Sequence, residues 1–233
     1  MAESFKWHPF YDDLMDRGDN ILIAGMPGAG KSVIINGIIN SILLKSANHN
    51  SMVLIDLKRV ELSPYRNTPN CMAFAETQQE AEQVLASVLQ FVNDRYTKMA
   101  ERGERKYSGT KVHLIIDEMA QLMVTSKRAR GLIQQIVQIS RAANVQVICA
   151  TQCPKATVIP TEITMAFGVI IGLHTRNAQD SRNILDKCGC EELPKFGRAL
   201  IRYENEPELQ NVMIPMIPYE EIDRLIQWRL SGN

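Results

Sequence analysis

The chain has 233 residues, 45% of them hydrophobic and 22% charged, and its 26 lysines and arginines equal its 26 aspartates and glutamates. This composition is typical of a globular protein and excludes disordered and fibrous classes. Zero net charge excludes a global positive field for nucleic acid or anionic lipid, so any DNA contact must be local. The N-terminus lacks a signal-peptide core and no apolar run approaches the ~20 residues that span a bilayer, so we expect a cytoplasmic chain without direct membrane insertion.

The five cysteines show no recognisable disulfide or zinc pattern. Their number is odd, and neither Cys149 with Cys153 nor Cys188 with Cys190 has the C-x-x-C spacing of a zinc ribbon. We interpret the cysteines as reduced thiols, with a metal site as the alternative.

The first half of the chain alternates short buried strands with helices. Apolar runs bounded by polar or turn residues predict strands at residues 21–24, 52–55 and 71–75. Apolar residues at helical spacing predict helices at residues 32–44 and from Thr77 to about Arg102. The first strand, a glycine-rich loop and the first helix follow one another directly, which is the context that a phosphate-binding loop requires.

The second half continues this alternation after a polar, glycine-bearing loop at residues 103–111. We expect strands at 112–116, 145–150 and 167–173, edge strands at 199–203 and 212–217, a helix through 132–141, and a last helix from Pro218 to near Leu230. This order predicts an α/β fold with a mostly parallel sheet and helices on both faces. We divide the chain into a lead-in (1–19), a core domain (20–217) and a C-terminal helix (218–233).

Residues 25–32 (GMPGAGKS) match the pattern of a phosphate-binding loop, or P-loop. In such a loop backbone N–H groups converge on phosphate oxygens, Lys31 reaches the terminal phosphates, and the Ser32 hydroxyl binds Mg²⁺. The following helix adds the positive end of its dipole. A chance match in an unrelated turn is the alternative, although the pattern fixes four positions between a strand and a helix. We expect a nucleoside triphosphate to contact Gly25, Met26, Pro27, Gly28, Ala29, Gly30, Lys31, Ser32 and Val33.

Polar side chains follow two later strands. Asp117 and Glu118 come directly after residues 112–116, where one carboxylate can orient the metal and the other can activate the attacking water. We assign Asp117 to Mg²⁺ and Glu118 to the role of general base, although an acidic pair taken alone is more often a solvated turn. Gln152 ends the next strand and could hydrogen-bond the γ-phosphate or the attacking water, or simply cap the strand.

Six segments carry motifs that extend beyond the P-loop. They are residues 20–33 (NILIAGMPGAGKSV), 54–65 (LIDLKRVELSPY), 94–96 (DRY), 115–123 (IIDEMAQLM), 141–154 (RAANVQVICATQCP) and 180–186 (DSRNILD). Together they resemble the motor domain of the FtsK/SpoIIIE family of double-stranded DNA translocases, part of the HerA/FtsK superfamily. The resemblance covers about residues 20–215.

The resemblance implies a RecA-like P-loop ATPase that assembles into a homo-oligomeric ring, expected to be a hexamer, around double-stranded DNA, with ATP and Mg²⁺ bound between subunits. In such rings an arginine from the next subunit stabilises charge on the γ-phosphate. Arg141 is the best match to that arginine, and Arg182 is the second candidate. Asp56 and Lys58 are candidates for supporting the site or the subunit interface. For all four residues, an ordinary surface or strand-end charge pair is the alternative.

The chain also departs from the family pattern. Ile170 stands where an arginine is usual, Cys153 replaces the arginine after Gln152, and the loop at 103–111 is short. The sequence shows no counterpart of the family's second ring tier, membrane anchor or DNA-reading winged-helix domain. We therefore expect a role in moving plasmid, phage or mobile-element DNA, or an excised motor domain.

Lys127, Arg128 and Arg130 form the densest basic cluster, which could face the pore of a ring. A ring multiplies one contact per subunit, so net neutrality does not exclude DNA binding. A solvated helix face is the ordinary explanation of such a cluster. Two other hypotheses stay open: a conjugative-coupling or secretion ATPase driven by a protein partner, and a degenerate nucleotide-binding module, against which the intact P-loop and acidic pair argue.

Overall fold

Eight strands and eight α-helices alternate along the described part of the chain, which comprises residues 5, 8–45, 47–152 and 157–232 of the computed structural model. The strands are β1 (Ile21–Ala24), β2 (Asn50–Ile55), β3 (Cys71–Ala75), β4 (Lys111–Ile116), β5 (Val145–Thr151), β6 (Val169–Gly172), β7 (Arg198–Tyr203) and β8 (Gln210–Met213). The α-helices are α1 (Pro9–Arg17), α2 (Lys31–Leu44), α3 (Gln78–Arg102), α4 (Met119–Thr125), α5 (Lys127–Ile139), α6 (Thr161–Thr164), α7 (Ala178–Leu185) and α8 (Tyr219–Leu230).

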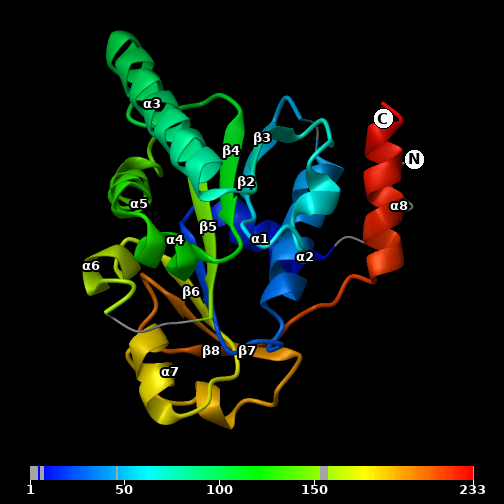
Figure 1. Ribbon diagram of the computed structural model, residues 1–233, viewed down its shortest axis with the longest axis vertical. Coiled ribbons are helices and arrows are strands. Elements are labelled where there is room, and N and C mark those ends of the chain that lie inside the picture. The colour runs from blue at the N-terminus through cyan, green and yellow to red at the C-terminus, as the bar shows by residue number, and fades with distance from the viewer. Residues whose placement is uncertain (1–4, 6–7, 46, 153–156, 233) are drawn as a thin grey trace.

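The strands form one sheet in the order β3-β2-β4-β5-β1-β6-β7-β8 (Figure 1). From β3 to β6 all neighbouring strands are parallel, whereas β7 is antiparallel to both β6 and β8. The predicted mostly parallel sheet is therefore confirmed, with an antiparallel hairpin closing one side.

Helices cover both faces of this sheet, as predicted (Figure 1). Helices α1, α2 and α8 bury apolar residues against one face, and α3 to α7 bury theirs against the other. Strand β4 contributes side chains to both faces. Leu114 and Ile116 pack against α3 to α7, and Ile115 packs on the opposite face with α1, α2 and α8. Burial on both faces explains why the strands read as continuous apolar runs.

Helix α1 is not predicted from the sequence. It begins at Pro9, where the fixed φ of proline suits the first turn, and is followed by Gly18 at a φ of 73°. The Tyr11 ring packs on Gly37 of α2, at a site where a Cβ atom would collide with the ring. The division at residue 20 stays a prediction, although α1, α2 and α8 share one apolar cluster.

Two predicted elements differ in the structure. The helix expected through 132–141 begins at Lys127, because the Ser126 hydroxyl accepts a hydrogen bond from the Ala129 N–H and starts α5 after the separate helix α4. The edge strand expected at 212–217 is β8 at Gln210–Met213 instead. Ile214 and Ile217 are apolar because they pack into the cluster under α8, not because they lie in a strand.

Within the described residues, no helix combines the length and the apolar character needed to cross a bilayer. The described cysteines, Cys71, Cys149, Cys188 and Cys190, are free thiols, and Cys153 lies outside the described residues.

Candidate functional site

The carboxyl ends of β1, β2, β4 and β5 meet at one edge of the sheet, because these strands are parallel and adjacent. A hollow of about 490 Å³ lies at this edge. Its lining includes residues 30–32 of the P-loop and the adjoining Val33, together with Asp117, Gln152, Lys58, Phe196 and Tyr219. The fold thus brings residues from four separate strand ends around one hollow.

The P-loop has the backbone shape that phosphate binding requires. Gly28 and Gly30 have φ values of 74° and 105°, a left-handed conformation that side-chain-bearing residues rarely adopt. The Lys31 Nζ donates hydrogen bonds to the carbonyl oxygens of Gly25 (2.7 Å) and Met26 (2.8 Å). The two carbonyl oxygens accept hydrogen bonds from the ammonium group of Lys31, as phosphate oxygens would. Burial lowers the pKa of Lys31 to about 8.

Asp117 lies buried beside this loop, with 8% of its surface exposed. Its backbone N–H donates to the Ile55 carbonyl, which ties the end of β4 to β2. Burial raises the pKa of Asp117 to about 6, so the carboxylate would gain from a nearby cation. Ser32 and Asp117 supply the oxygen donors that Mg²⁺ prefers, and both line the same hollow, so the residues present fit this ion.

Glu118 is held from two sides. Its Oε2 lies 3.3 Å from the Lys58 Nζ, and its Oε1 accepts a 3.2 Å hydrogen bond from the backbone N–H of Gln152. The Glu118 side chain is 11% exposed, and that of Lys58 is 41% exposed. The ionised form of Glu118, which a general base requires, is therefore placed between a cation and a backbone donor.

Asp56 shapes the loop that carries Lys58. Its buried carboxylate accepts hydrogen bonds from the backbone N–H groups of Lys58 (3.1 Å), Arg59 (2.9 Å) and Leu62 (2.9 Å). These bonds hold Arg59 at a φ of 59°. Asp56 therefore has a structural place behind the site, whereas Lys58 contacts the candidate base itself. The sequence pairs the two residues but does not distinguish these positions.

Arg141 lies at the opposite edge of the sheet. It precedes β5, and its guanidinium lies 2.8 Å from Asp19 before β1 and 3.4 Å from Glu204 after β7. The side chain is 57% exposed. Since the P-loop follows the other end of β1, Arg141 cannot reach the P-loop of its own chain. Its predicted role in a neighbouring site remains a prediction.

The turn that carries Arg141 is fastened by α3. The Arg95 guanidinium donates to the carbonyls of Ala143 (2.7 Å) and Asn144 (3.2 Å), and the Tyr96 hydroxyl donates to that of Ile139 (2.8 Å). Arg95 is 4% exposed and lies over two aromatic rings. Arg95 and Tyr96, from the segment 94–96 that the sequence singles out without a role, thus hold this turn in place.

The remaining predicted residues lie away from the P-loop hollow. Arg182 is exposed on α7 and donates to the Cys188 Sγ at 2.8 Å. Lys127 and Arg128 are exposed in the first turn of α5, and Arg130 is half-buried. Cations at a helix N-terminus oppose the helix dipole, so the position is unfavourable for stability and leaves a local positive patch.

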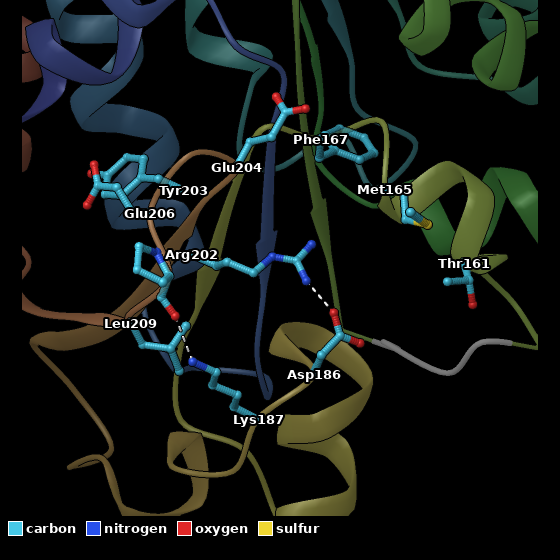
Figure 2. Close-up of a pocket in the computed structure, with 11 residues that line it drawn as sticks. Thr161, Met165, Phe167, Asp186, Lys187, Arg202, Tyr203, Glu204, Glu206 and Leu209 are labelled. Carbon is cyan, nitrogen blue, oxygen red and sulfur yellow. Dashed lines mark hydrogen bonds and ion pairs between the residues drawn. The ribbon is translucent and has the colours of Figure 1, made fainter.

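A hollow of about 530 Å³ lies between α6, α7 and the β7–β8 hairpin (Figure 2). There Arg202 pairs with Asp186, and Lys187 donates to the Pro207 carbonyl at 2.9 Å. Arg202 is the cross-strand partner of Ile170, the position where an arginine is usual in the family that the sequence resembles. Both cations are already engaged, so this hollow lacks the features of the phosphate site.

Comparison with known proteins agrees with the geometry. The FtsK/SpoIIIE family model matches residues 1–113. The chain is 32% identical to the DNA translocase FtsK of Oceanobacillus iheyensis, over 91% of this chain and 30% of that protein. It is also 32% identical to the DNA translocase FtsK of Listeria monocytogenes, over 93% of this chain and 32% of the relative. The chain spans about a third of the length of these relatives.

Solved structures share the fold at lower identity. The conjugation coupling protein TcpA of pCW3, solved with ATPγS, has a TM-score of 0.80 at 20% identity over 91% of this chain and 65% of that one. EssC (ATPases 2 and 3) of Geobacillus thermodenitrificans has a TM-score of 0.80 at 14% identity, over 92% and 44% of the two chains. These likenesses establish a P-loop ATPase fold.

Proposed function

Because the chain belongs to the FtsK/SpoIIIE family, we propose that it is an ATP-hydrolysing motor that translocates double-stranded DNA as a homo-oligomeric ring, with ATP bound between subunits. The observation that carries this proposal is the arrangement at the carboxyl edge of the sheet, where the P-loop, Asp117 and Glu118 come together. We expect the ring to contain six subunits and to act in the cytoplasm. We also expect a protein partner to recruit the ring to its DNA.

The chain's own residues divide the reaction among them. Bound ATP with Mg²⁺ supplies the phosphoryl group that is transferred to water. The backbone N–H groups of the P-loop and Lys31 bind the phosphates, while Ser32 and Asp117 hold the metal. Glu118 accepts a proton from the attacking water, for which it must separate from Lys58. The Gln152 backbone keeps Glu118 in place, and its side chain is free to approach the γ-phosphate.

The opposite positions of the P-loop and Arg141 support a shared site. A head-to-tail ring brings different surfaces of two neighbours together, so one edge of a subunit can meet the other edge of the next. Arg141 would then stabilise the charge that develops on the neighbour's phosphates. Arg182 remains the second candidate for this role. The effect of replacing Arg141 on ATP turnover should therefore be compared with the effect of replacing Arg182.

Duplex DNA should stimulate ATP turnover if the proposal is correct. We expect long duplex DNA to raise turnover several-fold at low salt, and single-stranded DNA to have less effect, because backbone phosphates of the duplex meet several subunits at once. The measurement is steady-state ATP hydrolysis titrated with each nucleic acid over a series of salt concentrations.

The exposed basic pair Lys127 and Arg128 provides a matched comparison. The double variant K127A/R128A should lose much of the duplex stimulation, whereas K98A/R102A, which removes two exposed cations from α3, should retain it. Equal turnover with and without duplex at every salt concentration would contradict the motor assignment. Stimulation by a protein partner alone would favour the coupling or secretion ATPase.

A further inference from the structure

The loop that follows β2 carries Lys58 into the P-loop hollow, which Lys31 and Asp117 also line. The charge of Lys58 acts on both of these neighbours. Burial is the main cause of the lowered pKa of Lys31, and Lys58 lowers it further. Burial also raises the pKa of Asp117, and Lys58 opposes that rise. Lys58 is therefore close to the side chains that would hold the phosphates and the metal.

Lys58 pairs with the candidate base. Its Nζ lies 3.3 Å from the Oε2 of Glu118, whereas the Oε1 accepts the hydrogen bond from the Gln152 N–H. Both carboxylate oxygens are thus engaged, and a general base needs an oxygen within hydrogen-bond reach of the attacking water. The lysine has to leave Glu118 before the base can act.

The loop fixes the backbone of Lys58 and leaves its side chain free to turn. The Asp56 carboxylate accepts hydrogen bonds from the backbone N–H groups of Lys58, Arg59 and Leu62. Arg59 has a φ of 59°, a costly conformation that persists only where the surroundings enforce it. The Lys58 side chain is 41% exposed, and its four-carbon stem is flexible. Its ammonium group can therefore change partner without a movement of the backbone.

We propose that Lys58 is a further catalytic residue, which exchanges Glu118 for the γ-phosphate when ATP binds. The inference rests on the proposed function. The triphosphate brings more negative charge into the hollow than the single carboxylate of Glu118, so the ammonium group moves to the phosphate oxygens. Water then forms the new bond to the γ-phosphorus, the bond to the bridging oxygen of ADP breaks, and Glu118 takes the proton of the water. Lys58 forms no covalent bond and transfers no proton.

The exchange makes the base available only when there is a phosphate to transfer. ADP lacks the γ-phosphate and leaves the pair of Lys58 and Glu118 intact. ATP draws Lys58 away, which frees Glu118 and places a cation on the oxygens where negative charge develops. Lys31 meets the phosphates from the end of β1, and Lys58 meets them from the end of β2.

Calorimetric titration with a nonhydrolysable ATP analogue and with ADP, each with Mg²⁺, isolates the γ-phosphate. Lys58→Met should weaken the analogue about tenfold and leave the affinity for ADP unchanged. The substitution keeps an unbranched side chain and the backbone hydrogen bond to Asp56. Lys98→Met, at an exposed position of α3, is the matched control and should change neither affinity.

The same titrations in a Glu118→Gln background remove a competing explanation. In the wild-type background, loss of Lys58 also uncovers the Glu118 carboxylate, which repels the γ-phosphate. In Glu118→Gln no charge is uncovered, and the added Lys58→Met should still weaken the analogue about tenfold. At saturating ATP, Lys58→Met alone should lower turnover about tenfold or more, because the contact strengthens as charge develops.

The outcomes are distinct. Unchanged affinity for the analogue in the Glu118→Gln background would overturn the proposal, and so would an equal loss for ADP. Turnover of Lys58→Met at or above the wild-type level would mean that Lys58 only restrains the base, which would also overturn it. Failure of the wild type to bind either nucleotide would contradict the proposed function itself. A lack of stimulation by duplex DNA, with the differences in binding intact, would contradict the motor and leave the role of Lys58 in place.

Discussion

Burial disfavours the charged forms of Lys31 and Asp117, which suits both side chains to binding ligands of opposite charge. Burial lowers the pKa of Lys31 to about 8 and raises that of Asp117 to about 6, so in each case the fold disfavours the charged form. A triphosphate beside Lys31 and a cation beside Asp117 would reverse these penalties. The same side chains that cost stability in the free protein would thus contribute to ligand affinity.

The sequence identifies these residues because their signals are local. Lys31 and Ser32 belong to an eight-residue pattern, and Asp117 follows an apolar run. The contact between Lys58 and Glu118 joins residues 60 positions apart, so no local pattern reveals it. Phe196 is missed for the same reason, since its position beside the P-loop depends on how β7 closes the sheet.

A buried histidine gives a prediction for stability against pH. His113 in β4 is fully buried, and burial lowers its pKa to about 3 from an ordinary value near 6.5. The unfolded chain therefore binds a proton that the native chain excludes, so the stability present above pH 6.5 is lost as the pH falls toward 3. The slope approaches about 1.4 kcal/mol per pH unit.

Comparison with His113→Gln isolates this effect. The free energy of unfolding of each protein is measured by urea denaturation at pH 7.5, 6 and 5. The stability advantage of wild type over the variant should shrink as the pH falls, while the opposite contribution of Asp117, whose raised pKa adds stability on acidification, cancels in the difference. Parallel curves for the two proteins would contradict the assignment.

Among the elements, α3 has two functions that its amphipathic pattern does not separate. Its apolar stripe predicts packing on the sheet. In the structure a Thr77–Glu80 capping box fixes its start, next to the residue from which the sequence predicts the helix. Its second function is to fasten the turn at 139–144 through Arg95 and Tyr96. The sequence analysis does not predict helices α1, α4, α6 and α7, because they are short and their stability comes from packing more than from local propensity.

Tyr96→Phe tests whether the contact between α3 and the turn at 139–144 affects ATP turnover. The substitution removes only the hydroxyl that donates to the Ile139 carbonyl at 2.8 Å. Because the turn carries Arg141, we expect turnover to fall several-fold while ATP affinity stays unchanged. Both are measured, as kcat and as the dissociation constant for a nonhydrolysable analogue.

Tyr65→Phe is the matched control, because it removes a buried hydroxyl that donates to Asn36 at 2.8 Å, far along the chain from the turn. Both variants should lose a similar small amount of stability, about 1 kcal/mol. If Tyr96→Phe and Tyr65→Phe had the same effect on turnover, the contact would be structural only.

At the scale of the whole molecule, the sheet separates the parts of the proposed site. The P-loop, Asp117 and Glu118 occupy its carboxyl edge, and Arg141 occupies its amino edge with Asp19 and Glu204. The α/β fold and the mostly parallel sheet follow from sequence periodicity, whereas the strand order and the contacts between subunits leave no such signal in one chain. The proposed catalytic role of Arg141 therefore depends on a second subunit, whereas the contacts of its turn with α3 lie within one chain.

The central claim is that two subunits complete each ATP site, and complementation between two inactive variants tests it most directly. Glu118→Gln and Arg141→Ala should each bind ATP but hydrolyse it at least a hundredfold more slowly than wild type. In co-expressed mixed rings, some interfaces combine Glu118 of one subunit with Arg141 of the next. ATP turnover should then recover to as much as about a quarter of the wild-type rate, the share expected for random assembly of equal amounts. A mixture as inactive as its two components, or full activity of Arg141→Ala alone, would contradict the shared site.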